Sequence, residues 1–207
     1  MVRMRPTVAV LVALALLAVG RAGAGAADGA TASVTFVGDS VPASIAYSAR
    51  AKTRLGSGLS VRLDLRVCRR LVAPSCPHHG STASTALQAV ESYGRGLGDV
   101  LIVDVGYNER ADGYRQGIDR VMRAALAQGA KGVVWVTLRE ARATYHATNV
   151  AIRGAAQRWK PLEVADWNAH SRGRAWFRQD GLHLTPAGAD ALAAFLRPYV
   201  LRAAGLR

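Results

Sequence analysis

Residues 100–105 read Val-Leu-Ile-Val-Asp-Val, and this almost continuous apolar run decides the fold class. A strand that is apolar at consecutive positions is covered on both faces, as in the centre of a parallel sheet. An amphipathic helix is predicted after it and ends at Gly129. Its apolar residues recur at helical spacing: Ile118, Val121, Met122, Ala125 and Leu126. Residues 133–138 then form a second apolar run. The order strand, helix, strand predicts parallel pairing of the two strands.

The same alternation extends to both ends of the chain. Upstream, it predicts a strand over 33–37, a helix over 41–54 with Pro42 in its first turn, and a half-buried strand near a sheet edge over 60–67. Downstream, it predicts a helix over 147–159, a short strand over 162–167, and a C-terminal helix that Thr185 caps, Pro186 begins and Pro198 kinks or frays. The pattern predicts one three-layer α/β/α domain with a flavodoxin-like, five-stranded parallel sheet.

Three polar blocks fall at strand ends or helix starts, where such sheets bind their ligands. They are Gly38-Asp39-Ser40, Gly106-Tyr107-Asn108-Glu109 and Asp180-Gly181-Leu182-His183. Each block alone is also typical of an ordinary turn, cap or solvated loop. Together they supply a hydroxyl, an amide donor and a carboxylate beside an imidazole, which are the groups of nucleophilic acyl transfer. The Gly-x-Ser-x-Gly elbow of the α/β-hydrolases is absent.

In their order and placement the blocks resemble those of the SGNH hydrolases, also called GDSL esterases and lipases, over essentially all of residues 28–207. The resemblance implies that Ser40 is the nucleophile, His183 the general base, and Asp180 the residue that orients the histidine. It also implies an oxyanion hole made of the Ser40 amide, the Cys68 amide and the Asn108 side chain. It implies no metal and no organic cofactor.

The chain departs from the family pattern at two positions. Cys68 occupies the place of a glycine, so the backbone freedom of glycine is lost there. Glu109 replaces the usual aspartate after Asn108. Residues 180–188 are also similar, more loosely, to the catalytic loops of bacterial cell-wall O-acetyltransferases and acetylesterases.

The resemblance thus implies a serine esterase that cleaves small-molecule or glycan esters, with short-chain or acetyl groups, through an acyl-enzyme on Ser40. Two alternatives stay open. One is a cell-wall polysaccharide O-acetyltransferase with the same triad, and the other is a non-catalytic wall-binding module that has kept the fold.

Cys68 and Cys76 are the two cysteines of the chain, and we expect them to form a disulfide. On the chain-entropy model, closing so short a loop stabilises a fold by about 2–3 kcal/mol. The neighbouring His78 and His79 make a zinc site the alternative. Its cysteine spacing does not fit the usual short Cys-x2–4-Cys pattern, so the disulfide is favoured.

Residues 1–27 have the order of a secretory signal peptide: Arg3 and Arg5, an apolar run over 8–19, and small residues over 22–27. The run is short of the roughly 20 residues that span a bilayer, although an uncleaved anchor is the alternative. The sequence therefore predicts a secreted or extracytoplasmic protein with no later membrane span.

The formal net charge is +13, and removal of residues 1–26 leaves +10 because three arginines and no acidic residue are lost. Such a charge favours an anionic cell-wall surface as a partner. No nucleic-acid-binding motif is present, so we expect no nucleic-acid partner.

The remaining aromatic and basic residues have two interpretations each. Trp135 is expected in the core, and Trp167, Trp176 and Phe177 either line a substrate pocket or, as favoured here, pack beneath the loop that follows. Arg139 and Arg142 either bind an anionic substrate or are simply solvated, and the second interpretation is favoured. His146 and His170 have no assigned role.

Overall fold

The computed structural model describes residues 31–110 and 112–206, together with Met1. The predicted signal peptide, apart from Met1, lies outside the described residues. Within the described part of the chain, no helix is long and apolar enough to cross a membrane.

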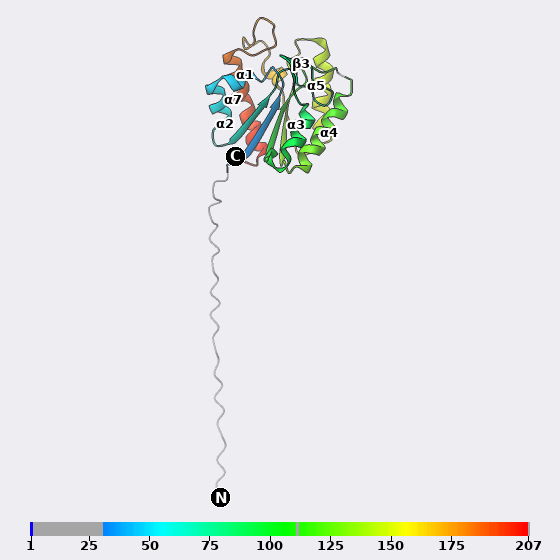
Figure 1. Ribbon diagram of the computed structural model, residues 1–207. Helices are drawn as coiled ribbons and strands as arrows, with labels where there is room; N and C mark the ends of the chain where they lie inside the picture. The colour runs from blue at the N-terminus through cyan, green and yellow to red at the C-terminus, as the bar shows by residue number, and fades with distance from the viewer. Residues whose placement is uncertain (2–30, 111, 207) are drawn as a thin grey trace. The chain divides into compact units, whose positions relative to one another are not determined.

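Five parallel strands form one sheet in the order β2-β1-β5-β6-β7 (Figure 1). Their bounds are β1 Ser33–Gly38, β2 Ser60–Leu65, β5 Val100–Asp104, β6 Gly132–Val136 and β7 Leu162–Ala165. Counted along the sheet, this is the 2-1-3-4-5 order of flavodoxin-like folds. All five residues of β5 are buried, and β2 lies at an edge, so the predicted sheet and the places of both strands are confirmed. Each predicted strand ends one or two residues earlier than the apolar run that suggested it, except β1, which runs one residue further.

Helices cover both faces of this sheet and complete the three layers (Figure 1). On one face α1 and α2 pack against α7, and on the other α4 packs between α3 and α5. The helix bounds are α1 Ser44–Tyr47, α2 Ala49–Gly56, α3 Ala86–Tyr93, α4 Tyr114–Ala127, α5 Ala143–Ala155, α6 Trp167–His170 and α7 Pro186–Ala203, with a 3-10 helix at Gly94–Leu97. Trp135 is fully buried between the layers, as predicted.

The helix predicted over 41–54 is in fact two helices. Ser48 is extended (φ −105°, ψ 109°), and its side chain accepts a hydrogen bond from the Ala51 amide at 3.1 Å, which caps α2. The Ser48 hydroxyl also donates to Asp190 of α7 at 2.9 Å. Pro42 therefore lies in the turn before α1 rather than in the first turn of a long helix. The periodicity did not show this break because apolar residues continue through it.

The other helix predictions need smaller corrections. The helix predicted over 147–159 begins four residues earlier and ends at Ala155. Thr185 caps α7 by accepting from the Gly188 amide at 3.1 Å, and Pro186 is at its first turn, as predicted. The helix continues past Pro198 to Ala203, so the predicted fraying at Pro198 does not occur.

The segment between β2 and β5 carries elements that the strand pattern did not predict. A small hairpin (β3 Pro77–His78 and β4 Ser81–Thr82) precedes α3, whose start has a capping box of Thr85 and Gln88. Arg69 is only 1% exposed and holds the segment to β2 through Asp64, with Nη2 to Oδ1 at 3.1 Å. Asp64 is therefore buried, although it is a polar residue within the strand that was predicted to be half-buried.

Candidate active site

Ser40 and His183 come together although 143 residues separate them in sequence. Ser40 lies in the turn after β1, and His183 lies in the loop before α7. His183 Nε2 is 3.1 Å from Ser40 Oγ, and His183 Nδ1 is 2.7 Å from Asp180 Oδ2. The three predicted triad side chains are thus arranged in one hydrogen-bonded line.

Asp180 determines which imidazole nitrogen carries the proton. Hydrogen bonds from the His183 ring and from the Leu182 and His183 amides lower the pKa of the Asp180 carboxyl to about 2. An ionised carboxylate only accepts hydrogen bonds, so His183 Nδ1 must be the donor at neutral pH. In neutral His183, Nε2 is then an acceptor facing the Ser40 hydroxyl.

The loop that carries Asp180 and His183 is closed at its base. Phe177 and Leu184 form an antiparallel bridge, and the Arg178 amide donates to the His183 carbonyl at 2.7 Å. The Ser44 hydroxyl donates to the Leu184 carbonyl at 3.3 Å, which ties the loop to α1. A local hairpin of this kind holds the imidazole over the turn that contains Ser40.

Asp39 is a buried anchor between the two strand ends, and the sequence analysis gave it no role of its own. Its side chain accepts from the Val41, Gly106 and Tyr107 amides at 3.0, 3.1 and 3.1 Å. Burial raises the pKa of the Asp39 carboxyl to about 6, although these amides oppose the rise. An aspartate in a turn often accepts from the amide two residues on, so the bond from Val41 was open to prediction, whereas those from Gly106 and Tyr107 come from another strand end.

Asn108 and Cys68 lie on neighbouring loops beyond the strand ends. The Asn108 amide donates to the Arg69 carbonyl at 3.2 Å, and the Arg70 side chain donates to the Asn108 carbonyl at 2.8 Å. One of the two Asn108 amide hydrogens is thus used for positioning, and the other is available to a ligand. Glu109 accepts from the Leu71 amide, so the glutamate at this position does make a supporting hydrogen bond.

Cys68 has φ of 63°, the left-handed conformation that glycine adopts most easily. It forms a disulfide with Cys76, as predicted, and the Cys76 amide donates to the Cys68 carbonyl at 3.4 Å. The two sulfurs are bonded to each other, so the zinc interpretation loses its thiolate ligands. The disulfide and this hydrogen bond fix the loop in a conformation that a cysteine does not favour by itself.

The helix after Ser40 is shorter than predicted. Because α1 begins at Ser44 and has only four residues, Ser40 is followed by the turn of residues 41–43 rather than by the first turn of a long helix. No long helix dipole is directed at Ser40.

The aromatic residues before the loop pack beneath it. Trp167 is 1% exposed and stacks on Trp176 with ring centroids 5.5 Å apart. The ring centroids of Phe177 and Trp167 are 6.3 Å apart, and the Arg139 guanidinium lies 3.5 Å from the centroid of the Phe177 ring. Trp167 thus packs in the interior, as the favoured interpretation predicted. Phe177 connects the loop that carries His183 to Arg139, which follows β6.

Two solved structures share this fold. The C-terminal catalytic domain of peptidoglycan O-acetyltransferase A from Streptococcus pneumoniae, solved with a methylsulfonyl adduct, aligns with a TM-score of 0.63 at 18% identity, over 84% of this chain and 95% of that domain. A member of the carbohydrate acetylesterase family from Sinorhizobium meliloti aligns with a TM-score of 0.62 at 15% identity, over 84% of this chain and 100% of its own.

The chain matches no protein-family model and no curated protein. At these identities the two structures establish the fold and nothing finer. That fold is of the SGNH-hydrolase type, as the resemblance of the sequence implied.

Proposed function

We propose that this protein is a serine esterase that cleaves acyl esters, with short-chain or acetyl groups, through an acyl-enzyme on Ser40. The observation that carries the proposal is the line of two hydrogen bonds from Asp180 through His183 to Ser40. A neutral imidazole held by an ionised carboxylate, with its second nitrogen on a hydroxyl, is the arrangement that activates a serine.

The reaction proceeds in two steps. Ser40 Oγ attacks the ester carbonyl while His183 Nε2 takes the hydroxyl proton, and the positive charge on the imidazole is stabilised by Asp180. The alcohol leaves with the proton from His183, and the acyl group stays on Ser40. Water then attacks the acyl-enzyme with His183 again as base, which releases the acid and restores the serine.

The negative oxygen formed in each step needs hydrogen-bond donors. We assign this role to the backbone amides of Ser40 and Cys68 and to the free hydrogen of the Asn108 side-chain amide. Loss of one such donor typically costs on the order of 10²–10³ in rate. The hydrogen bond from Asn108 to the Arg69 carbonyl supports the assignment because it orients the amide before substrate arrives.

Solvent exposure favours hydrolysis over transfer to another alcohol. The side chains of His183 and Asp180 are 37% and 48% exposed, so water has access to the base that would activate it. A transferase must let its acceptor compete with that water. The fold shared with a peptidoglycan O-acetyltransferase domain keeps acetyl transfer to a cell-wall sugar as the second candidate.

The place of action that we propose is outside the cytoplasm. It rests on the signal-peptide pattern of residues 1–27, whose removal would leave a domain over 28–207, and on the Cys68–Cys76 disulfide, since disulfides persist in oxidising compartments. The net positive charge suits association with an anionic wall surface.

Hydrolysis of p-nitrophenyl acetate tests the nucleophile. Ser40→Ala should lower kcat at least about 10³-fold because the remaining groups cannot form an acyl-enzyme. Ser92→Ala is the matched control. Among the described residues the Ser92 hydroxyl donates only to the Ala89 carbonyl of α3, and the activity of the variant should equal that of the wild type. Undiminished turnover by Ser40→Ala would refute the assignment.

A fluorophosphonate probe separates an enzyme from a wall-binding module with the same fold. The wild type and Ser92→Ala should become labelled, and Ser40→Ala should not. Acetylated glycan substrates, offered with and without an acceptor sugar, then separate hydrolysis from acetyl transfer.

A further inference from the structure

A polar pocket lies at the carboxyl ends of β6 and β7, the sheet edge where Ser40 also lies. It has a volume of about 320 Å³ and is lined by Arg139, Glu140, Asn168, Ser171, Arg172 and Gly173. The first two residues follow β6, and the others belong to α6 and the turn after it. None of the six has a role in the proposed acyl transfer.

Two hydrogen-bond donors of this pocket are buried without a partner among the described residues. Ser171 is 2% exposed and its hydroxyl makes no hydrogen bond, and Arg139 Nη1 is buried with none either. Buried polar groups in proteins nearly always have a partner, and an unmade hydrogen bond costs free energy. Both are donors, so a ligand that enters this pocket is expected to carry hydrogen-bond acceptors.

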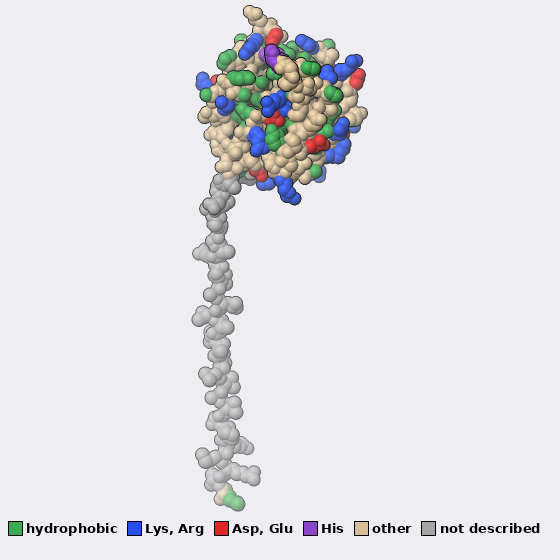
Figure 2. Space-filling model, viewed as in Figure 1, with side chains coloured by type: hydrophobic (Ala, Val, Ile, Leu, Met, Phe, Trp, Pro, Cys, Tyr) green, Lys and Arg blue, Asp and Glu red, His purple; other side chains and the backbone are tan. Residues whose placement is uncertain are grey.

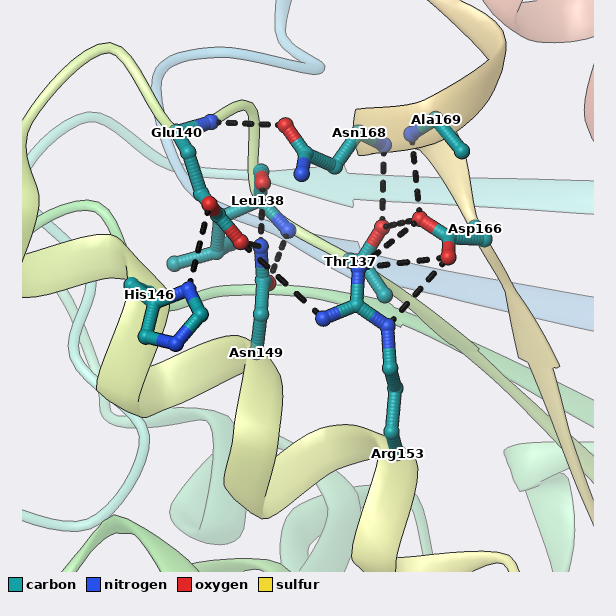
Figure 3. Close-up of polar contacts among 9 residues, drawn as sticks. All are labelled: Thr137, Leu138, Glu140, His146, Asn149, Arg153, Asp166, Asn168 and Ala169. Carbon is teal, nitrogen blue, oxygen red and sulfur yellow. Dashed lines mark hydrogen bonds and ion pairs between the residues drawn. The ribbon is translucent and has the colours of Figure 1, made fainter.

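The carboxylate of Glu140 does not serve as that acceptor because it is directed into a different network (Figure 3). Its oxygens bind the Asn149 side-chain amide at 2.9 Å and His146 Nδ1 at 3.3 Å. Arg153 lies 3.9 Å from the same group, so the negative charge is already shared.

Asn168 adds a third donor. Its backbone amide donates to Thr137 Oγ1 at 3.0 Å, and its side-chain oxygen accepts from the Glu140 amide at 2.9 Å (Figure 3). The side-chain orientation is thereby fixed, and its NH₂ group has no acceptor in the described part of the chain. With Arg139 and Arg172, the pocket has an excess of donors and of positive charge.

The pocket is in contact with both halves of the candidate active site through Arg139. The Arg139 amide donates to the Tyr107 hydroxyl at 2.8 Å, and Tyr107 precedes Asn108. The Arg139 guanidinium lies over the ring of Phe177, which is bridged to Leu184 at the base of the loop carrying His183. Arg139 thus joins the pocket to the residues beside Asn108 and to the base of the loop that carries His183, on the sheet edge where Ser40 lies.

We propose that the pocket binds a carboxylate on the alcohol portion of the ester, so that the protein prefers acyl esters of acidic sugars to those of neutral ones. The preference for such esters rests on the proposed esterase function. A guanidinium pairs with both oxygens of a carboxylate, and hydroxyl and amide donors complete the set.

Two acetyl esters that differ in one group test the preference: acetylated methyl glucuronide, with a carboxylate, and acetylated methyl glucoside, without it. The wild type should have the higher kcat/KM for the glucuronide. Arg139→Met, whose side chain can still pack on Phe177, should reduce that preference, taken as the ratio of the two kcat/KM values, about tenfold, and Ser171→Ala about threefold. Arg142→Met, in the same loop but outside the pocket, should leave the preference within about twofold of the wild type.

A titration of ¹⁵N-labelled protein with methyl glucuronide itself, which has no ester to cleave, reads the pocket without catalysis. Amide signals of residues 139–140 and 168–173 should shift with methyl glucuronide and not with methyl glucoside. Equal shifts, or none, would overturn the proposal, as would an ester preference that Arg139→Met and Ser171→Ala leave intact. If neither ester is cleaved, the esterase function fails, and the titration still decides whether the pocket binds a carboxylate.

Discussion

Two aspartates lie buried beneath the Ser40 turn, and their environments differ. Asp39 accepts three backbone hydrogen bonds, whereas both oxygens of Asp104 have no partner among the described residues. Burial, and then the nearby charge of Asp39, raise the pKa of the Asp104 carboxyl well above its ordinary range. In the folded protein Asp104 therefore favours its protonated form more than a solvated aspartate does, at the end of the central strand and under the residues proposed to react.

The raised pKa of Asp104 determines how the stability of the fold depends on pH. A group with a raised pKa in the folded state stabilises the fold below its ordinary pKa, and the contribution is lost as the pH rises toward the folded value. Asp104→Asn has no proton to lose. We expect the variant to match the wild type near pH 4 and to have the larger free energy of unfolding at pH 8.

Urea unfolding at pH 4, 6 and 8 measures this difference, which we expect to exceed about 1 kcal/mol at pH 8 because each unit of pKa shift corresponds to about 1.4 kcal/mol. Asp112→Asn, which removes an exposed carboxylate, is the control for the loss of a charge. If the free energies of unfolding of the wild type and Asp104→Asn change in the same way with pH, then Asp104 ionises in the folded protein as easily as in the unfolded chain.

At the scale of elements, the loop after β2 gives a prediction about the proposed oxyanion hole. Cys68 keeps a left-handed backbone (φ 63°) within the disulfide loop. The left-handed conformation raises the free energy of a residue with a β-carbon by on the order of 1–2 kcal/mol and that of glycine by almost nothing. Without the disulfide, only glycine should hold the Cys68 amide in place.

We therefore expect the double variant Cys68→Gly/Cys76→Ser to retain more kcat toward p-nitrophenyl acetate than Cys68→Ala/Cys76→Ser. Both should unfold at lower urea than the wild type, since about 2–3 kcal/mol of loop-closure stabilisation is lost. Steady-state kinetics and urea unfolding measure the two effects. Equal kcat values for the two variants would argue that the amide at position 68 is not held for catalysis.

Elements with strong hydrophobic periodicity could be predicted from the sequence. Features that depend on contacts between elements, such as a helix break or the burial of a polar side chain, could not. The apolar run at Val100 and the capped start of α7 came out as predicted. The break at Ser48 did not, because its hydrogen bond to Asp190 comes from a helix 142 residues away. The burial of Asp64 was not predicted, because it depends on the ion pair with Arg69.

In the candidate site, too, some residues could be predicted from the sequence and others could not. The resemblance named Ser40, Asp180, His183 and Asn108, and the structure brings Ser40, Asp180 and His183 together. It did not name Asp39 or Asp104, since a buried carboxyl is recognised from the burial of its neighbours and not from its own residue type. The apolar run that Asp104 interrupts was the signal available in the sequence.

At the scale of the whole molecule, positive charge is spread over the surface and is not confined to the site. Lys and Arg side chains are distributed across the face drawn in Figure 2. On α4, Arg115, Arg120 and Arg123 are exposed, and no ion pair with them is found among the described residues. Such a surface attracts polyanions without a specific site, and the attraction is screened by salt over a Debye length of about 10 Å at 0.1 M and about 3 Å at 1 M.

We expect the protein to bind purified anionic cell-wall material at low salt and to be released as the salt concentration rises toward 1 M. Replacing Arg115, Arg120 and Arg123 together by glutamine should move release to lower salt, because the long-range attraction depends on the total charge. Co-sedimentation at increasing NaCl measures release, and turnover of a neutral ester checks that the site is intact. Binding that neither salt nor these substitutions weaken would mean that the wall is recognised by specific contacts, and the charge would then need another explanation.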